Sequence, residues 1–377
     1  MVCFGTRPEV IKLAPVIDAL RSRPGVEPVL VTTAQHREML DQMLETFELE
    51  PDADLGLMRE RQSLAELTGA AIPGLARTIE EHQPDAILVQ GDTTTAFCGA
   101  LAGFYADVPV GHVEAGLRTL DPRLPFPEEV NRRLVSVLAR WHWAPTRTNA
   151  ESLLREGVDP SAISITGNTV IDALLSIAAK ELPPELAVLL PPKRAPRRIL
   201  VTMHRRETQG AGQRELSRML ADVASRDDVE VVFPVHLSPA VRESVFAELA
   251  GAEHVHLIDP LDYHSFTHLL KSSDLVVTDS GGLQEEAPVF GIPVLVMRDA
   301  TERSEGLEAG VVRLSGTDAE SVREDVLELL DDPLAYEAMA RAANPYGDGQ
   351  AADRIVGQLA NDLGAGGEPD ALLAGTM

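Results

Sequence analysis

A serine followed by two glycines in the second half of the chain could bind a phosphate. The apolar run 275–277 has the length of a buried parallel strand, and DSGG at 279–282 leads from it into a predicted helix that begins near Leu283. Two glycines at such a turn let backbone amides approach a ligand closely, and a helix N-terminus favours an anion. Ser280 could cap the helix or contact the same anion. An ordinary capped turn between a strand and a helix has the same pattern, so both interpretations stay open here.

Two carboxylates, Glu285 and Glu286, follow the glycines and are expected in the first turn of this helix. A negative charge there interacts favourably with the helix dipole, so one of them could be purely structural. Gly291 then predicts the end of the helix, before a further apolar strand.

Three carboxylic acids are expected at a sheet edge formed by the first half of the chain. Asp92 follows the predicted strand 86–89, and Glu114 follows the predicted strand 108–113. Glu128 begins a helix after a proline-rich loop. Each acid alone could be a helix cap or an ion-pair partner, and Asp92 could cap the helix that follows it. Three acids on successive loops favour a functional site.

Two cations lie near the same kind of edge. Arg7 follows the first predicted strand, Val2–Phe4, after a turn that Gly5 permits, and Lys12 lies one turn further along the next helix. Open α/β proteins bind ligands at the carboxyl edge of the sheet, so Arg7 is placed to contact an anion. The alternative is that Arg7 is a solvated loop cation.

Strand and helix signals alternate through both halves of the chain. Further strands are predicted at 29–32, 141–144, 163–166, 199–202, 229–233 and 255–258. A proline-rich stretch at 183–196 connects the halves. Two such halves predict an α/β fold of two Rossmann-like, doubly wound domains that face each other across a ligand cleft.

The same pattern predicts the extent of each domain. We place the N-terminal domain at residues 1–168, joined by the C-terminal helix 351–363, the second domain at 169–350, and a disordered tail at 364–377. We also expect a polar loop without a strand at 51–61 and one continuous helix over 320–343.

The composition restricts the partners and the compartment. The chain of 377 residues has 59 acidic and 33 basic residues and a formal net charge of −26, so we expect neither nucleic acid nor an anionic membrane as a partner. Cys3 and Cys98 lie in apolar surroundings, which is typical of buried thiols in a reducing compartment. No apolar run has the length of a membrane span and no signal peptide precedes the first strand, so we expect a cytoplasmic protein.

GxGxxG, P-loop, HExxH and CxxC motifs are absent, so NAD, ATP hydrolysis and structural zinc are not expected.

Ten colinear segments between Phe4 and Ile355 resemble those of the non-hydrolysing bacterial UDP-N-acetylglucosamine 2-epimerases. They are FGTRPEVIKLAP at 4–15, TAQHREMLDQ at 33–42, GDTTT at 91–95, GHVEAGLRT at 111–119, PEEVNR at 127–132, TGNTVIDALL at 166–175, HRRE at 204–207, PVHLSP at 234–239, TDSGGLQEEAP at 278–288 and NPYGDGQA at 344–351. The resemblance implies the GT-B architecture and reversible C2 epimerisation of UDP-GlcNAc to UDP-ManNAc without NAD or metal, usually as a homodimer. Such enzymes would supply ManNAc-type sugars for polysaccharide or secondary-metabolite pathways.

The resemblance also implies roles for individual residues. The catalytic group would be Asp92, Glu114, Glu128 and His204. The substrate-binding group would be Arg7, Lys12, Arg132, Phe266, Ser280, Gly281, Gly282, Glu286 and Arg303. The diphosphate would lie on Arg7 and Ser280–Gly282, with His204, the ribose on Glu286 and the uracil near Phe266. A second, allosteric UDP-GlcNAc site would include Gln35, Glu38, Arg61, Arg205 and His236, and Glu38 would weaken it by repelling the diphosphate.

Inversion at C2 without NAD requires the C2 hydrogen to leave as a proton, although no carbonyl group acidifies it. Departure of UDP from C1 gives C1 oxocarbenium character and so acidifies C2, which predicts elimination to a 2-acetamidoglucal followed by re-addition. A glycosyltransferase, a hydrolysing epimerase and a catalytically silent sugar-nucleotide sensor are the alternatives. The first would need an acceptor, the second would need water at the intermediate, and the third would not need the three acids.

Overall fold

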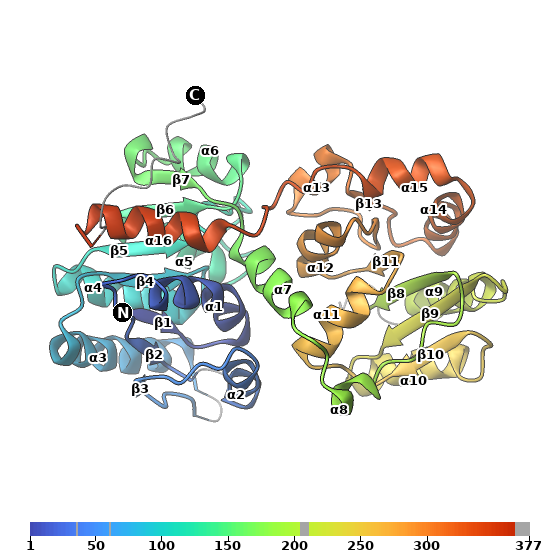
Figure 1. The fold of residues 1–377 in the computed structure, drawn as a ribbon, viewed down its shortest axis with the longest axis horizontal. Coiled ribbons are helices and arrows are strands. Elements are labelled where there is room, and N and C mark those ends of the chain that lie inside the picture. The colour runs from blue at the N-terminus through green and yellow to red at the C-terminus, as the bar shows by residue number, and fades with distance from the viewer. Residues whose placement is uncertain (35–36, 60–61, 204–210, 366–377) are drawn as a thin grey trace. The chain divides into compact units, whose positions relative to one another are not determined.

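The computed structural model describes residues 1–34, 37–59, 62–203 and 211–365. Its contacts divide the chain into two compact units, Met1–Ala173 with Gly347–Met377, and Leu174–Tyr346. In each unit, helices alternate with parallel strands (Figure 1). No helix in the described ranges is both long enough and apolar enough to cross a bilayer.

The first unit is built on a parallel sheet whose described strands have the order β3-β2-β1-β4-β5-β6-β7. They are β1 (Val2–Phe4), β2 (Leu30–Thr32), β3 (Ala53–Asp54), β4 (Ile87–Gln90), β5 (Val110–Val113), β6 (Trp141–Ala144) and β7 (Ile163–Ile165). The direction of winding reverses between β1 and β4, and doubly wound sheets bind their ligands at that point.

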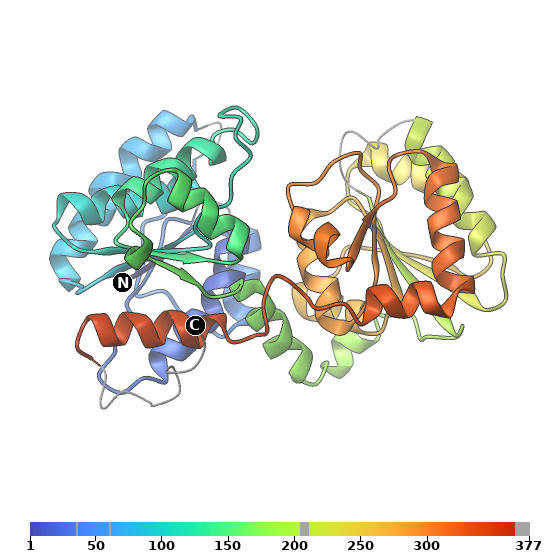
Figure 2. The same cartoon turned by 90° about the horizontal axis from the view of Figure 1, so that it is seen from above.

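Helices cover both faces of this sheet (Figure 2). On one face lie α3 (Leu64–His82), α4 (Thr94–Tyr105) and α5 (Glu128–Leu138), and on the other α1 (Arg7–Arg21), α2 (Arg37–Thr46) and α16 (Ala351–Asp362). The unit also contains α6 (Arg147–Arg155), the short helix η1 (Pro160–Ala162) and the start of α7 (Thr169–Ala179). Two buried indoles hold α16 in place, because the N–H groups of Trp141 and Trp143 donate to Asp362 and Gln358 at 2.7 and 2.9 Å.

The second unit contains a parallel sheet of described order β10-β9-β8-β11-β12-β13. Its strands are β8 (Arg197–Thr202), β9 (Val229–Pro234), β10 (Val255–Ile258), β11 (Leu275–Thr278), β12 (Val294–Val296) and β13 (Val312–Leu314). Its helices are α8 (Pro184–Ala187), α9 (Ala211–Val223), α10 (Pro239–Leu249), α11 (Tyr263–Lys271), α12 (Gly281–Glu286), η3 (Ala287–Phe290), α13 (Ser304–Ala309), α14 (Ala319–Asp331) and α15 (Pro333–Ala340).

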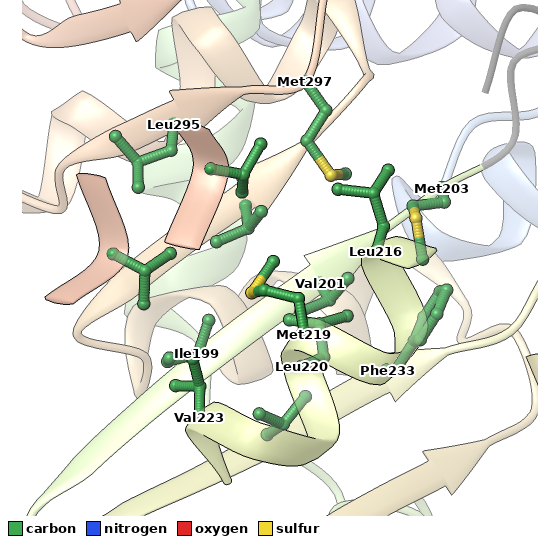
Figure 3. Close-up of a cluster of buried hydrophobic side chains, with 14 of the residues drawn as sticks. Ile199, Val201, Met203, Leu216, Met219, Leu220, Val223, Phe233, Leu295 and Met297 are labelled. Atoms are coloured by element: carbon green, nitrogen blue, oxygen red, sulfur yellow. The ribbon is translucent and has the colours of Figure 1, made fainter. Parts of the chain in front are cut away.

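The continuous apolar runs of these strands are explained by a core on each face of the sheet. Ile199 and Val201 pack with Leu220 and Phe233 in one cluster (Figure 3), whereas Leu200, between them, belongs to the cluster on the other face. Successive side chains of a strand point to opposite faces, so a strand buried on both sides has no polar alternation.

The predicted strands are all present, with ends within two residues of the predicted ones. The prediction that 51–61 forms only loop is wrong at β3, a two-residue edge strand too short for a periodic signal. Asp52 holds it against β2, donating its N–H to the Leu30 carbonyl at 2.8 Å and accepting the Leu30 N–H on its carboxylate at 2.7 Å. Strand β13 was also missed.

The single helix predicted over 320–343 is two helices, α14 and α15. Asp332 lies between them and accepts the Leu334 N–H at 2.8 Å. Pro333 has no N–H to continue the hydrogen bonding of α14, so the chain restarts a helix there.

The two cysteines are buried thiols, as predicted. Cys3 and Cys98 are free and have no exposed surface. Burial raises the pKa of each thiol to about 12, so both stay protonated at neutral pH.

Candidate active site

The β1–α1 turn places Arg7 at the carboxyl edge of the first sheet. Arg7 is the first residue of α1, and its side chain is exposed. Gly5, just before it, has no room for a side chain, because a Cβ would lie 2.1 Å from Thr33 Oγ1 and 2.5 Å from Thr95 Oγ1. Those two hydroxyls are hydrogen bonded to each other at 2.7 Å. The turn therefore packs directly on its neighbours.

A buried carboxylate, Glu9, holds this turn. It accepts the N–H groups of Gly5 and Thr6 at 3.0 and 2.8 Å, and the hydroxyls of Thr6 and Thr93 at 2.8 and 2.7 Å. Burial raises the pKa of Glu9 to about 7, although these hydrogen bonds oppose the shift. No role for Glu9 is predicted from the sequence, since nothing local connects it to Thr93.

Asp92 is anchored on α5 and does not cap α4. The cap is Thr93, whose hydroxyl accepts the Ala96 N–H at 3.0 Å. The guanidinium of Arg132 lies on Asp92 Oδ2, at 2.7 Å from Nη2 and 2.8 Å from Nε. The side-chain amide of Asn131 donates to the Asp92 carbonyl at 2.9 Å. Asp92 is thus held in place by the first turns of α5.

A further acid, Glu129, was missed by the sequence analysis. It is fully buried and accepts hydrogen bonds from Arg132, Arg133 and the Thr119 N–H, each at 3.0 Å. Burial alone would raise the pKa of Glu129, but these donors lower it below its ordinary value. Arg132 therefore bridges Glu129 and Asp92. The signal was the spacing of an acid three and four residues before two arginines on one helix.

Glu114 follows β5 and has a φ of 63°, a left-handed conformation that few non-glycine residues adopt. Its Oε1 lies 2.5 Å from Lys12 Nζ and accepts the side-chain amide of Asn168 at 3.1 Å. Its Oε2 accepts the side-chain amide of Gln90. Lys12, which we predicted to contact substrate, is thus paired with one of the predicted catalytic acids.

Glu128, the third predicted acid, is the first residue of α5 and is partly buried. Its Oε2 is buried and makes no hydrogen bond to the described residues. In this respect it differs from Asp92 and Glu114, whose carboxylates both accept hydrogen bonds from cations.

The sheet topology explains why these groups gather. Strands β1, β4 and β5 are parallel neighbours, so the turns that follow them end at the same edge. A Cβ on Gly91 would lie 3.6 Å from Glu114 Oε2, which shows how closely Glu114 approaches the turn of Asp92. The structure therefore brings Arg7, Asp92 and Glu114 to one edge, with Glu128 on the helix anchored there.

The β11–α12 turn begins its helix earlier than predicted. Ser280 is the N-cap residue and Gly281 the first helical residue, and the Ser280 side chain makes no capping hydrogen bond. Glu285 and Glu286 therefore lie in the last turn, and the prediction that they complement the helix dipole in the first turn is wrong. Glycine disfavours helices, which is why the start was predicted too late.

The two glycines of this turn have different surroundings. A Cβ on Gly281 would lie 2.5 Å from Nη1 of Arg303, whose guanidinium donates to Glu285 at 2.6 Å and also pairs with Glu302. Burial would raise the pKa of Glu302, but Arg303 and then Arg298 lower it to about 2. Gly281 thus makes room for an arginine of the protein itself.

Gly282, by contrast, is exposed, and a Cβ there would meet only Glu286 Oε1, at 3.8 Å. Glu286 acts electrostatically on Tyr263, the first residue of α11: burial and then the charge of Glu286 raise the pKa of that tyrosine well above its ordinary value. Phe266, on the same helix, is partly buried against the core of this unit. Gly282, Glu286 and the start of α11 therefore form one region of the second unit.

The remaining predicted residues are largely beyond the described part of the chain. His204, Gln35, Arg61 and Arg205 fall outside the described residues, as does the side chain of Glu38. His236 is described, and its Nδ1 accepts the Ser238 N–H at 3.1 Å.

Comparison with known proteins places the chain in a family. Residues 18–360 match the family model described as UDP-N-acetylglucosamine 2-epimerase. The UDP-N-acetylglucosamine 2-epimerase of Escherichia coli strain K12 is 51% identical over 371 residues, covering 96% of this chain and 98% of the relative.

Solved structures agree with this match. The Neisseria meningitidis UDP-GlcNAc 2-epimerase bound to UDP-GlcNAc has a TM-score of 0.85 and 43% identity, covering 96% of this chain and 99% of that one. The Methanocaldococcus jannaschii enzyme in complex with UDP-GlcNAc and UDP has a TM-score of 0.76 and 30% identity, covering 96% and 99%. With its two Rossmann-like α/β domains of GT-B type, the chain belongs to the UDP-N-acetylglucosamine 2-epimerase family.

Proposed function

We propose that the protein interconverts UDP-GlcNAc and UDP-ManNAc by eliminating UDP to a 2-acetamidoglucal and adding it back after protonation of the opposite face of C2. The observation that carries the proposal is a group of three acids in a member of this family: Asp92 and Glu114 lie at one sheet edge, and Glu128 lies at the start of the helix that is anchored there. The relative from Neisseria meningitidis, solved with UDP-GlcNAc, supports this choice of substrate.

The chemistry explains why several acids are needed. In the first step a carboxylate takes the C2 proton, the C–H electron pair becomes the C1=C2 double bond, and UDP leaves with the C1–O electron pair. In the second step an acid delivers a proton to the other face of C2, and a phosphate oxygen of UDP bonds to C1. Removal and return of the proton occur on opposite faces of the ring, so one carboxyl group cannot perform both.

The acids differ in how they could serve these steps. Asp92 and Glu114 accept hydrogen bonds from Arg132 and Lys12, which fix their positions. Oε2 of Glu128 is buried and makes no hydrogen bond within the described residues, so no donor fixes this oxygen as Arg132 and Lys12 fix those of the other two acids. We propose that the three share removal and return of the C2 proton.

The leaving group needs stabilisation of the charge that develops on UDP. We assign this role to the backbone amides of Ser280–Gly282 and to Arg7. A helix N-terminus contributes roughly 0.3–2 kcal/mol toward an anion. A charge-assisted hydrogen bond from an arginine adds about 1.5–3 kcal/mol. The open position of Gly282 and the exposure of Arg7 support this assignment.

Incubation with UDP-GlcNAc and identification of the products by NMR tests the proposal. We expect a mixture of UDP-GlcNAc and UDP-ManNAc that is also reached from pure UDP-ManNAc. Release of free ManNAc and UDP would instead indicate a hydrolysing epimerase, transfer to an added acceptor a glycosyltransferase, and unchanged UDP-GlcNAc that remains bound a sensor.

We also propose a homodimer that buries an apolar face of the first unit. Val130, Leu134 and Val137 lie on one side of α5, at helical spacing, and are 39%, 41% and 83% exposed. Phe104 and Tyr105, at the end of the neighbouring α4, are 61% and 70% exposed. Large apolar side chains exposed on two neighbouring helices support an interface at this face.

The mass in solution tests this assignment. Sedimentation should give the mass of a dimer for the wild type and that of a monomer for Val137→Glu. In a dimer of this variant, the new charge would be buried in the interface without a partner. Val188→Glu, which replaces another exposed valine (80%), should remain dimeric. A monomeric wild type, or a dimeric Val137→Glu, would contradict the assignment.

A further inference from the structure

Glu9 connects two turns that carry different parts of the site. Its Oε2 accepts three hydrogen bonds from the β1–α1 turn, from the Gly5 N–H at 3.0 Å and from the N–H and hydroxyl of Thr6, both at 2.8 Å. Its Oε1 accepts the hydroxyl of Thr93 at 2.7 Å. Thr93 follows Asp92, so one carboxyl group joins the turn of Arg7 to the turn of Asp92.

Helix capping does not account for this arrangement. A glutamate at the third helical position that bonds back to the cap residue is a familiar capping device, and the three bonds to Oε2 are of that kind. Capping does not require the bond to Thr93, which comes from a different turn 84 positions away. The same device at Ser63 and Glu66 is exposed, whereas Glu9 has no exposed surface. A buried carboxyl group is tolerated only where its hydrogen bonds are satisfied, so its place fixes both turns.

We propose that Glu9 is a positioning residue for epimerisation, holding Arg7 and Asp92 in register with each other through Thr93. The inference rests on the proposed function. Thr6 is adjacent to Arg7 in the chain, and Thr93 is adjacent to Asp92. A relative shift of these turns moves the anion-binding cation against the acid, and a misplacement of about 1 Å can cost about 100-fold in rate.

The decisive variant is Thr93→Val, which keeps the shape of the side chain but removes the hydroxyl that contacts Glu9. We expect kcat to fall about 10- to 100-fold while KM changes less than about threefold. Thr93→Ser, which restores the hydroxyl, should restore kcat. Ser63→Ala removes the cap of α3 without touching Glu9 and should keep wild-type kcat, which controls for the loss of a helix cap.

Substitution of Glu9 itself gives a second comparison. In Glu9→Gln the amide oxygen can accept the three bonds from Gly5 and Thr6, and the amide N–H₂ can donate to Thr93 Oγ1. We therefore expect kcat within about fivefold of wild type. Glu9→Leu removes both connections and should lose at least as much kcat as Thr93→Val. The Thr93 variants decide the matter where Glu9→Leu does not fold.

Two further measurements separate positioning from general stability. Thr93→Val added to Asp92→Asn should lower kcat no further than Asp92→Asn alone, because Thr93 acts through Asp92. Hydrogen exchange needs no activity: in Thr93→Val, amide exchange should increase at Gly5 and Thr6 as well as near residue 93. Absence of epimerisation by the wild type would contradict the proposed function alone, and the exchange measurement would still test the connection. Wild-type kcat in Thr93→Val, or faster exchange only near residue 93, would overturn the inference.

Discussion

Asp92→Asn, Glu114→Gln and Glu128→Gln are each expected to lower kcat for epimerisation by about 10²- to 10⁴-fold, the range typical of a lost general acid or base. Binding of UDP should stay within a few fold of wild type, because the residues assigned to the diphosphate are unchanged. Each carboxamide keeps the shape of the side chain. The amide oxygen introduced by Asp92→Asn can still accept from Arg132, and the buried Oε2 of Glu128 makes no hydrogen bond within the described residues that would be lost.

Steady-state kinetics and UDP titration of the three variants provide the measurement, with Asp159→Asn as the control. Asp159 is an exposed acid that caps η1, accepting the Ser161 N–H at 2.8 Å, and asparagine caps equally well. It should keep wild-type kcat. If all three carboxamide variants also turned over at the wild-type rate, the acids would be structural and the proton-transfer assignment would be wrong.

Arg7→Ala should weaken UDP binding by about 10- to 150-fold, whereas the three carboxamide variants should bind UDP nearly as the wild type does. This range corresponds to the roughly 1.5–3 kcal/mol of one charge-assisted hydrogen bond. The exposed guanidinium at the start of α1 supports a direct contact with the diphosphate. Calorimetric titration with UDP at fixed ionic strength measures the effect, because salt screens exposed charges.

The same helix supplies a matched control. Arg21 is an exposed arginine at the other end of α1, about 21 Å from Arg7 along the helix axis. Arg21→Ala makes the same change in net charge and should leave UDP affinity within about twofold of wild type. Equal affinities of the two variants would show that Arg7 contributes only long-range charge, or nothing, to binding.

The fold could be predicted from local patterns. Short apolar runs such as 275–277 and 199–201, separated by helical segments, define parallel strands buried on both faces. Two consecutive series of them define two doubly wound sheets. The sheet edges then place Arg7, Asp92 and Glu114 correctly, because the residue after a parallel strand lies at the carboxyl edge. The errors came where a local signal was weak, as at the two-residue β3, or misleading, as at Gly281, where a glycine begins a helix.

The connections within the site could not be predicted in this way. The Lys12–Glu114 pair joins residues 102 positions apart, and the Glu9–Thr93 bond joins residues 84 positions apart. Such partners are set by strand order, which periodicity does not specify. Thr93 shows the consequence, because its hydroxyl both caps α4 and contacts Glu9. The cap of α4 is therefore the residue after Asp92 and not Asp92 itself.

The central claim is that C2 is inverted by exchange of a proton after departure of UDP. Turnover of UDP-GlcNAc in D₂O, followed by NMR and mass spectrometry of the sugar, tests it most directly. Elimination and re-addition predict that UDP-ManNAc forms with deuterium at C2, because the carboxyl group that protonates the intermediate exchanges its proton with solvent. UDP-ManNAc that retains the original C2 hydrogen throughout would contradict the mechanism.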